Sequence, residues 1–474
     1  MFAIFFIVLS ATSSSAQKTW TLEQSAAYAI EHNISIRQSQ SNEKLSAFTL
    51  NQAKLNLLPN LSGSVGYYFN FGKTIDPTTS LFVNQNTQTN TLQLSASWPI
   101  FNGLQKLNLI KENEFGLLAS RANTQATEQN ILLSVAGAFL DIVYAKENLI
   151  NSNDQLSLSQ QQLTRSRILI ETGSAAPGSI YNIEAQVAQD ELNRVNAENQ
   201  LALAKLSLAQ LMNLSDPVVD VMVPDINMSN ELLVDLNKNG DSIYQIALKK
   251  QAVIRSSEFA LMSSEKALAA IKGAQYPSLS LFGSISTNYS NAYQQLISFD
   301  TVSGGISQIG FVESTGEAVV SPELNFVPRL GDVPYYDQLT DNFGQTFGLS
   351  LDIPIFNNWN TRTNISRSKI NVVNAQYNLQ SAKLQLQKDV QIAYQDAVGS
   401  KNSYEALLKS VASLQRAFED AQKRYNLGSI NSFDYTTAKS NLSKAQSDLL
   451  QSKYRYIFNL KVLDVYQGKP LTLQ

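Results

Sequence analysis

Two long stretches of the chain carry apolar residues at helical spacing and contain no proline. One follows Pro99 and ends at Gly173, the other follows Pro354 and ends at Gly428, and the two are equally long. Apolar positions recur at steps of three, four and seven residues, as in a seam that packs against a partner helix. The pattern predicts two long helices, over residues 103–172 and 358–427, each on the order of 100 Å long. The matching seam positions are Phe115, Leu118, Ala122, Phe139 and Val143 in the first helix, and Ile370, Val373, Tyr377, Tyr394 and Val398 in the second.

The apolar pattern changes to period two before each long helix. Residues 61–71 alternate larger apolar residues and glycine with mostly small or polar ones, and residues 92–100 alternate in the same way. In the second half, residues 279–289 and 343–355 repeat this alternation. Period two indicates strands, so we expect one β-hairpin over about residues 60–101 and another over about 278–356. Each strand is about as long as a tilted strand that spans a membrane.

Shorter helices are expected on both sides of these segments. Residues 19–58 have the pattern of one helix, with Thr21 as its N-cap and Pro59 at its end. A helix returns after each long one, over residues 179–212 and 432–466.

Together these elements predict two structural repeats, residues 17–212 and 241–474. A linker over residues 213–240 joins them, and its valines at 218, 219, 221 and 223 predict a small strand. The second hairpin has the longer loop, residues 290–342, which we expect to be irregular and available for recognition.

Composition narrows the class of protein. The 474 residues include 0 cysteines, which excludes disulfides, thiolate metal ligands and a cysteine nucleophile. A formal net charge of -3 gives no reason to expect nucleic acid as a partner.

Residues 2–9 form a short apolar run, and small residues up to Ala16 follow it, which predicts a signal peptide over residues 1–16. A run of about 8 apolar residues is too short to anchor the chain in a membrane.

Four strands with one apolar face cannot close into a barrel, yet in lipid every strand edge has to be paired. Other copies of the chain must therefore close the sheet, and two copies would supply about 8 strands and three copies about 12.

Because each long helix follows a strand directly, the helices would lie on one side of the membrane. Both hairpin loops, including residues 290–342, would lie on the other side. Tyr67, Phe69 and Trp98 are expected to belong to aromatic girdles at the membrane interfaces.

The most specific motif lies at the end of the second long helix. Arg424-Tyr425-Asn426-Leu427-Gly428 is followed by Phe433-Asp434 and Ala438, and each long helix is preceded by Pro-Ile-Phe-Asn. With the duplicated helix–hairpin–helix halves, these residues resemble the TolC family of outer-membrane efflux proteins over nearly the whole mature chain. The resemblance implies a mainly α fold with membrane β structure. It implies a homotrimer whose 12-stranded β-barrel, with four strands per chain, continues into a long α-helical coiled-coil barrel.

The same resemblance implies a passive export conduit from the periplasm of a Gram-negative bacterium to the exterior, with no catalysis and no cofactor. Its partners would be further copies of the chain, outer-membrane lipid, a periplasmic adaptor (membrane fusion protein) and an inner-membrane transporter of the RND or ABC class. The transporter would supply the energy, and the adaptor would meet the periplasmic tip of the helices.

Individual residues at the tip can be matched to the family pattern. Tyr425 matches a tyrosine that helps to hold the tip closed, and Asp434 matches an aspartate whose symmetry-related copies form a cation-attracting ring at the entrance. Ile430 stands in place of a gating arginine and Thr437 in place of a second aspartate, so the ring would carry half the charge. The adaptor-docking residues implied at the two turns are Gly173, Ser174, Leu427, Gly428 and Ser429.

Structural roles are the alternatives for the same residues. An acid such as Asp434 stabilises the first turn of a helix through the helix dipole. Tyr425 can be a packing residue of the seam. Gly173 and Gly428 are expected to end the long helices as C-caps in the left-handed conformation.

Other functions agree less well with the sequence. Gly66 to Thr74 resembles a phosphate-binding loop, but its glycines are one residue too far apart and a strand lies between them. His32 is the only histidine, and no His-Glu-x-x-His pattern or cysteine lies near it, so neither a metal site nor an enzyme is predicted.

Three functions are left to compare. Type I protein secretion is the alternative to small-molecule efflux, because both use the same kind of channel. A periplasmic adaptor would also have long helical hairpins, but it should have a lipoyl-like β domain and no strands of membrane-spanning length.

Overall fold

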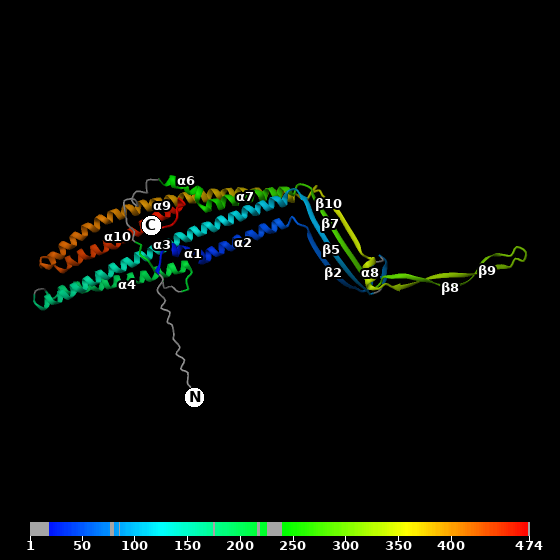
Figure 1. Cartoon of the computed structure of the whole chain (residues 1–474), viewed down its shortest axis with the longest axis horizontal. Helices are drawn as coiled ribbons and strands as arrows, with labels where there is room; N and C mark the ends of the chain where they lie inside the picture. The colour runs from blue at the N-terminus through cyan, green and yellow to red at the C-terminus, as the bar shows by residue number, and fades with distance from the viewer. Residues whose placement is uncertain are drawn as a thin grey trace, which may run out of the picture. The chain divides into compact units, whose positions relative to one another are not determined.

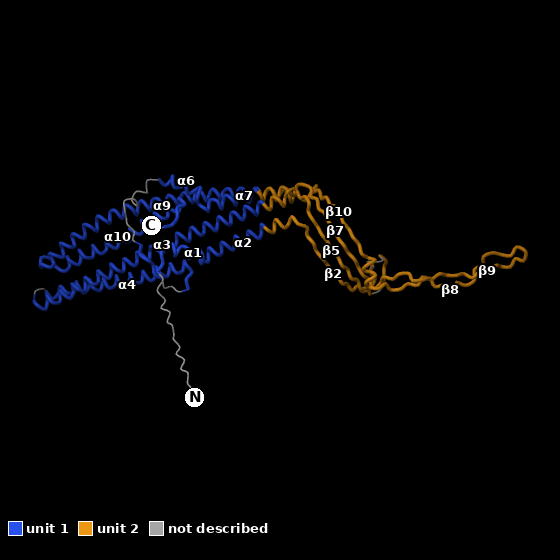
Figure 2. The backbone as a smooth tube through the Cα atoms, in the orientation of Figure 1, with its two compact units in different colours: residues 1–50, 111–265, 369–474 blue, residues 51–110, 266–368 orange. Residues whose placement is uncertain are grey.

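The chain folds into two compact units, shown in different colours in Figure 2. The computed structural model describes residues 19–75, 80–84, 86–173, 176–215, 219–224 and 239–472. Unit 1 consists of residues 1–50, 111–265 and 369–474, and unit 2 of residues 51–110 and 266–368. Each unit therefore draws on both predicted repeats. The predicted signal peptide and most of the predicted linker lie outside the described residues.

Helices make up most of unit 1, and Figure 1 labels them. Its helices, four of which also contain residues of unit 2, are α1 (Leu22–His32), α2 (Ile34–Leu55), α3 (Gln105–Glu171), α4 (Ser179–Met212), α6 (Gly240–Lys250), α7 (Ala252–Gly273), α9 (Asn360–Asn426) and α10 (Ser432–Tyr466). The predicted long helices correspond to α3 and α9, which have 67 residues each. The return helices α4 and α10 have the bounds that the sequence predicts. None of the helices in the described part of the chain combines the length and the apolar character needed to cross a membrane.

The prediction of one helix over residues 19–58 is wrong in one respect, because the segment contains a strand and two helices. Thr21 is the N-cap of α1, as predicted, and forms a capping box with Gln24. The helix then ends at Asn33, whose extended backbone interrupts it. The Asn33 side chain accepts a hydrogen bond from the backbone N–H of Ser35 at 2.9 Å and donates one to the carbonyl of Leu211 at 2.8 Å. A distant tertiary contact therefore holds the break between α1 and α2.

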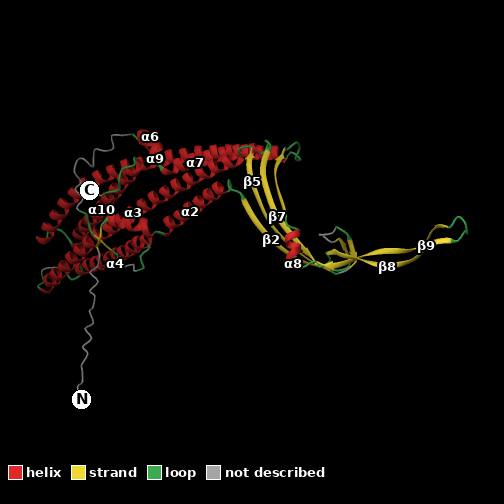
Figure 3. Cartoon of the chain, turned by 45° about the vertical axis from the view of Figure 1, so that its right-hand side comes forward, coloured by secondary structure: helices red, strands yellow, loops and turns green. Residues whose placement is uncertain are grey.

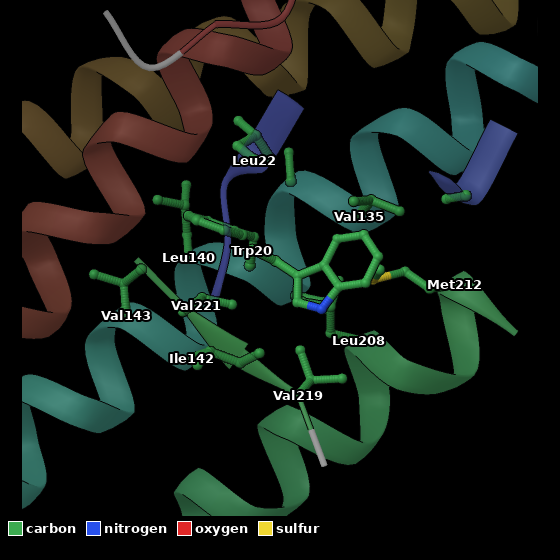
Figure 4. Packing of buried hydrophobic residues seen from close by; sticks show 14 of the residues in the cluster. Trp20, Leu22, Val135, Leu140, Ile142, Val143, Leu208, Met212, Val219 and Val221 are labelled. Carbon is green, nitrogen blue, oxygen red and sulfur yellow. The ribbon is translucent and has the colours of Figure 1, made fainter. Parts of the chain in front are cut away.

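Trp20 lies in the main buried cluster of unit 1 (Figure 4). Strand β1 (Thr19–Trp20) pairs in parallel with β6 (Asp220–Val221), so the small strand predicted from the linker valines is confirmed at Val221. Val218 lies outside the described residues. Helices α1, α3, α4 and α10 and Val219, which precedes β6, supply the rest of the cluster. Its labelled members in Figure 4 are Trp20, Leu22, Val135, Leu140, Ile142, Val143, Leu208, Met212, Val219 and Val221.

Unit 2 contains a four-stranded antiparallel sheet, whose strands lie side by side in Figure 3. The strand order is β10 (Gly344–Asp352), β7 (Ser278–Ser290), β5 (Thr87–Asn102) and β2 (Asn60–Asn70). These are the four strands that the sequence predicts. Strands β10 and β2 are the edges, and each leaves one row of backbone N–H and C=O groups unpaired within the sheet.

The register places apolar side chains on one face of this sheet and polar ones on the other. Leu94 of β5 lies opposite Ile285 of β7, while its neighbour Ser95 lies opposite Ser284. The same alternation extends to both edges, because Leu349 pairs with Leu281 and Leu61 pairs with Ala96. Most of the larger apolar side chains are exposed to solvent in the single chain. The sheet is therefore amphipathic across all four strands.

The long second loop is not irregular, which corrects the expectation for residues 290–342. It contains a two-stranded hairpin, β8 (Gln294–Phe311) and β9 (Ala318–Asp332), followed by the short helix α8 (Tyr335–Asp341). Three register shifts interrupt β8, and each breaks the period-two alternation that would have revealed a strand. Among its described residues, the first hairpin carries the short strands β3 (Lys73–Ile75) and β4 (Phe82–Asn84) at the corresponding place.

Candidate functional site

The two helical hairpins of unit 1 turn at glycines with a left-handed backbone. Gly173 follows α3 with a φ of 74°, and Gly428 follows α9 with a φ of 71°. The Gly428 N–H donates to the carbonyl of Tyr425, and the Ser429 N–H donates to that of Arg424, which satisfies the last carbonyls of the helix. The expected C-cap conformation is thus confirmed at both glycines. Leu427 and Ser429 are exposed beside this turn, and Ser174 lies outside the described residues.

Tyr425 is half-buried in a small aromatic cluster beside the second turn. Its ring stacks on that of Tyr435 with 4.9 Å between the centroids, and Tyr435 also contacts Phe418. The Tyr425 hydroxyl lies 3.4 Å from the hydroxyl of Ser166 on α3. Ile430, where the family pattern has an arginine, packs into the same cluster as an apolar residue. Within one chain Tyr425 therefore packs within the second hairpin and contacts the first.

Asp434 lies in the first turn of α10, next to the buried Tyr435. The side chain of Asn431 caps this helix by accepting the Asp434 backbone N–H at 2.8 Å, so the carboxylate of Asp434 is not used for capping. That carboxylate is exposed, and Thr437 is exposed as well, with its hydroxyl donating to the carbonyl of Phe433. An exposed carboxylate beside the turn is free to bind cations or basic groups.

A buried ion pair joins the two hairpins near these residues. The ammonium of Lys439 on α10 lies 2.8 Å from Oδ2 of Asp190 on α4, and the two residues are only 2% and 3% exposed. Lys439 also donates to the carbonyl of Gln155 at 2.7 Å and to the hydroxyl of Ser159, which in turn donates to Asp190. Gln186 donates to the other oxygen of Asp190 at 2.9 Å. All three hydrogens of the ammonium thus have acceptors.

The buried position of Lys439 weakens the affinity of its side chain for a proton. Burial lowers the pKa of the Lys439 ammonium, and the hydrogen bond and negative charge of Asp190 oppose that decrease. A charge that is buried and fully hydrogen-bonded costs much less than one that is merely buried.

The sequence analysis missed this pair, although the sequence contains a signal for it. Asp190 lies seven residues from Ile183 and from Ala197, and all three are buried on one stripe of α4. Lys439 likewise lies between Tyr435 and Leu442 on the buried stripe of α10. A single charged residue in an apolar stripe is often a device that specifies the partner helix.

The expected girdle residues occupy one face of the sheet in unit 2. Tyr67 lies opposite Asn90 of β5, and Trp98 lies on the same strand as Asn90, eight residues further on and on the same face. Eight residues of strand correspond to about 26 Å. The Tyr67 ring packs edge-to-face on Phe69, and the Trp98 indole N–H donates to the carbonyl of Leu57 at 2.8 Å. The sheet thus carries aromatic residues at two levels about one hydrocarbon thickness apart.

An amphipathic sheet of strands long enough to span a membrane, continuous in sequence with long helical hairpins, defines the class of outer-membrane channel subunits. The chain belongs to the outer membrane efflux protein family, whose pattern matches residues 27–214 and 243–468. The family consists of channel proteins. The protein is accordingly an export channel of the outer membrane of a Gram-negative bacterium.

Individual relatives agree with this assignment. The chain is 22% identical over 428 residues to outer membrane protein TolC of Escherichia coli, covering 90% of this chain and 78% of the relative. It is 20% identical over 452 residues to outer membrane efflux protein BepC of Brucella suis, with 94% and 86% covered. Its fold is shared by the solved outer membrane protein VceC of Vibrio cholerae, with a TM-score of 0.74, 15% identity, and 95% and 97% of the two chains covered.

Within the residues that the structure describes, no three His, Cys, Asp or Glu side chains are grouped as a metal site requires.

We expect Lys439→Met to destabilise unit 1 by about 3–5 kcal/mol, because the carboxylate of Asp190 would be left buried without a counter-ion. The double variant Lys439→Met/Asp190→Leu should recover most of this loss. Chemical unfolding of the detergent-solubilised protein, followed by circular dichroism, measures the difference. Lys444→Met, which removes an exposed lysine of the same helix, is the control and should change little. Additive effects of the two substitutions would contradict the coupling.

Tyr435 should make the protein sensitive to alkali. Burial, followed by the proximity of Tyr425, raises the pKa of the Tyr435 hydroxyl to about 12. Between about pH 10 and 12 the unfolded chain therefore loses this proton while the folded chain keeps it, so stability falls as pH rises. Tyr435→Phe should remove up to about 2.7 kcal/mol of that fall, at about 1.4 kcal/mol per pKa unit.

Unfolding at pH 8 and at pH 11.5 tests this expectation. The exposed Tyr181→Phe serves as the control. At pH 8, Tyr435→Phe should not destabilise the protein, because the buried Tyr435 hydroxyl has no hydrogen-bond partner among the described residues. An equal alkaline loss in wild type and Tyr435→Phe would show that other groups dominate.

Proposed function

We propose that three copies of this chain form one export conduit. Their twelve strands would close a β-barrel in the outer membrane, and their helical hairpins would form a tube in the periplasm. The observation that carries this proposal is the amphipathic four-stranded sheet with two unpaired edges, β2 and β10. In a bilayer each unpaired backbone group costs several kcal/mol, so the edges of one chain need those of its neighbours. Three chains give a barrel of about 12 strands, wide enough for a pore.

The aromatic residues of the sheet support a membrane position for it. Tyr67 and Trp98 lie about 26 Å apart along β5, and Phe69 lies two residues beyond Tyr67 on the side away from Trp98. An apolar band about 25 Å tall, with an aromatic girdle at each border, is what an outer-membrane barrel presents to lipid.

The second long helix supports association of copies in the helical part. Its predicted seam residues Ile370, Val373 and Tyr377 are exposed in the single chain, Tyr377 by 65%. The equivalent positions of the first long helix are less exposed, since Phe115 and Leu118 are half-buried and Ala122 is buried. An apolar stripe at coiled-coil spacing without a partner in its own chain fits a neighbouring copy.

The turns of the hairpins supply the features of a gated entrance. In this proposal the exposed Asp434 carboxylates of three copies form a ring that attracts cations, and Tyr425 helps to hold the hairpins together in the closed state. A periplasmic adaptor would dock at the exposed turns around Gly173 and at Leu427, Gly428 and Ser429. An inner-membrane transporter of the RND or ABC class would supply the energy.

Efflux of small solutes is the function that we favour over type I protein secretion. The matched family and relatives such as BepC of Brucella suis carry efflux in their names. Protein secretion uses the same architecture and remains the alternative, which a transport assay with each pump class would separate.

The native mass of the protein extracted in mild detergent should correspond to three copies. Tyr377→Asp places a charge on the exposed seam and should lower the assembled fraction, whereas Asn378→Asp, one residue away, should not. Mass spectrometry of the intact assemblies measures both. Two copies would retain a channel but contradict the twelve-stranded barrel, and a single copy would contradict the proposal as a whole.

Asp434→Asn should weaken block of the channel by multivalent cations by at least about tenfold when they are added from the side of the helical tip, on the order of 1.4 kcal/mol. The cause is the loss of one charge per copy at the entrance. Single-channel conductance in planar bilayers measures the block. Asp154→Asn removes an exposed charge of α3 and is the matched control. Equal block in wild type and Asp434→Asn would contradict the ring.

A further inference from the structure

The hairpin β8–β9 in unit 2 has one apolar face, although nearly all residues of both strands are exposed. Every second residue of β9 from position 318 to position 330 is apolar: Ala318, Val320, Pro322, Leu324, Phe326, Pro328 and Leu330. The residues paired with them on β8 lie on the same face, and they are Phe311, Gln308, Ile306, Ser303, Thr301, Phe299 and Leu296. We call this surface the ribbon face.

Register shifts in β8 keep Leu296, Phe299, Ile306 and Phe311 on the ribbon face. Leu296 and Phe299 are three residues apart, so a regular strand would point them to opposite sides. The shift between Leu296 and Ser298 inserts one extra residue and returns Phe299 to the same side. The shifts after Ser303 and after Gln308 do the same for Ile306 and Phe311. The interruptions that hide this strand in the sequence are therefore what makes the hairpin amphipathic.

The opposite face carries three charged side chains. They are Asp300, Glu323 and Arg329, and beside them lie serine, asparagine and glutamine side chains, three valines and two isoleucines at the register shifts, Ile297 and Ile309. The ribbon face has no charged side chain between Leu296 and Phe311. This contrast argues that the ribbon face is covered in the assembled protein, whereas the charged face contacts water.

The ribbon face is too large to be left bare. Phe326 is 65% exposed and Phe299 is 56% exposed, and the other large side chains are exposed to a similar extent. With 15 residues in β9, the face is about 50 Å long and about 10 Å wide, on the order of 500 Å². An apolar patch of this area is at the upper end of the range of the largest apolar patches on soluble monomers. A two-stranded hairpin is also marginally stable by itself in water.

The base of the hairpin is firmly attached to the four-stranded sheet. Helix α8 follows β9, and its Gln338 accepts the Ser290 backbone N–H at 3.0 Å and donates to the carbonyl of Val333 at 2.9 Å. The Thr287 hydroxyl of β7 donates to the carbonyl of Leu339, and the Tyr335 ring packs on that of Tyr289. Each hairpin therefore leaves the sheet from a fixed place. Copies that share a barrel would present their hairpins side by side at its mouth.

We propose that the ribbon faces of neighbouring copies of this chain pack against one another, so that the β8–β9 hairpins join into one bundle beyond the barrel. This inference rests on the proposed oligomeric channel. A second copy is the occupant because the face is apolar, uncharged and self-complementary, and because the sheet edges already bring identical hairpins together. Two such faces bury on the order of 1,000 Å², which suffices for a contact that continues an existing interface.

Cysteine cross-linking tests the packing, since the chain has 0 cysteines of its own. Phe326→Cys places a thiol on the ribbon face, and Asn325→Cys places one on the charged face of the same strand. Mild oxidation of whole cells should link Phe326→Cys into dimers of the chain at least about ten times more completely than Asn325→Cys, because a disulfide needs Cα atoms within about 7 Å. Leu324→Cys and Glu323→Cys form a second matched pair in case the first pair fails to assemble.

Every other outcome contradicts the proposal. Equal cross-linking on both faces, or none, would show that the ribbon faces do not meet. A trimeric native mass without the cross-link would overturn the packing and leave the channel intact, whereas a monomeric mass would overturn both. Linkage of Phe326→Cys to a protein of another mass, or quenching of a fluorophore on this cysteine by lipid-attached quenchers, would identify a different occupant.

Discussion

The constraint on which this structure depends is the pairing of backbone hydrogen bonds at the edges of an amphipathic sheet. Strands β10, β7, β5 and β2 pair along their lengths and sort their side chains into an apolar face and a polar face. Such a sheet suits the boundary between lipid and water, but its two edges do not. Hydrocarbon offers no substitute for the missing partners, and this is the physical ground for proposing that neighbouring copies complete the sheet.

In the helical unit, the long helices have to stay aligned with one another although few buried residues hold them together. Three separate buried clusters hold it, around Trp20, Ile254 and Tyr435. Thin seams of this kind offer few features that distinguish one alignment from the next. The buried pair of Lys439 and Asp190 provides such a feature, since an ammonium with three acceptors has one satisfactory position. The pair thus favours one alignment of the two hairpins over sliding of one along the other.

The two hairpins of the sheet show how a repeated plan diverges. The first ends in the short strands β3 and β4, while the second carries the long, bulged ribbon of β8 and β9. The bulges preserve an apolar face at the expense of regular alternation.

Much of this fold is determined by the sequence alone, because its signals are local. Helix and strand periods, the prolines at 99 and 354, and the glycines at 173 and 428 bound the long helices and the four strands, and the motif from Arg424 to Asp434 indicates the family. Only the tertiary structure decided the break at Asn33, whose side chain bonds to Leu211, and the pairing of Lys439 with Asp190, 249 residues apart. The same holds for the register shifts that align Leu296, Phe299 and Ile306 on one face. In each case the conformation depends on a partner far away in the chain, which no local pattern specifies.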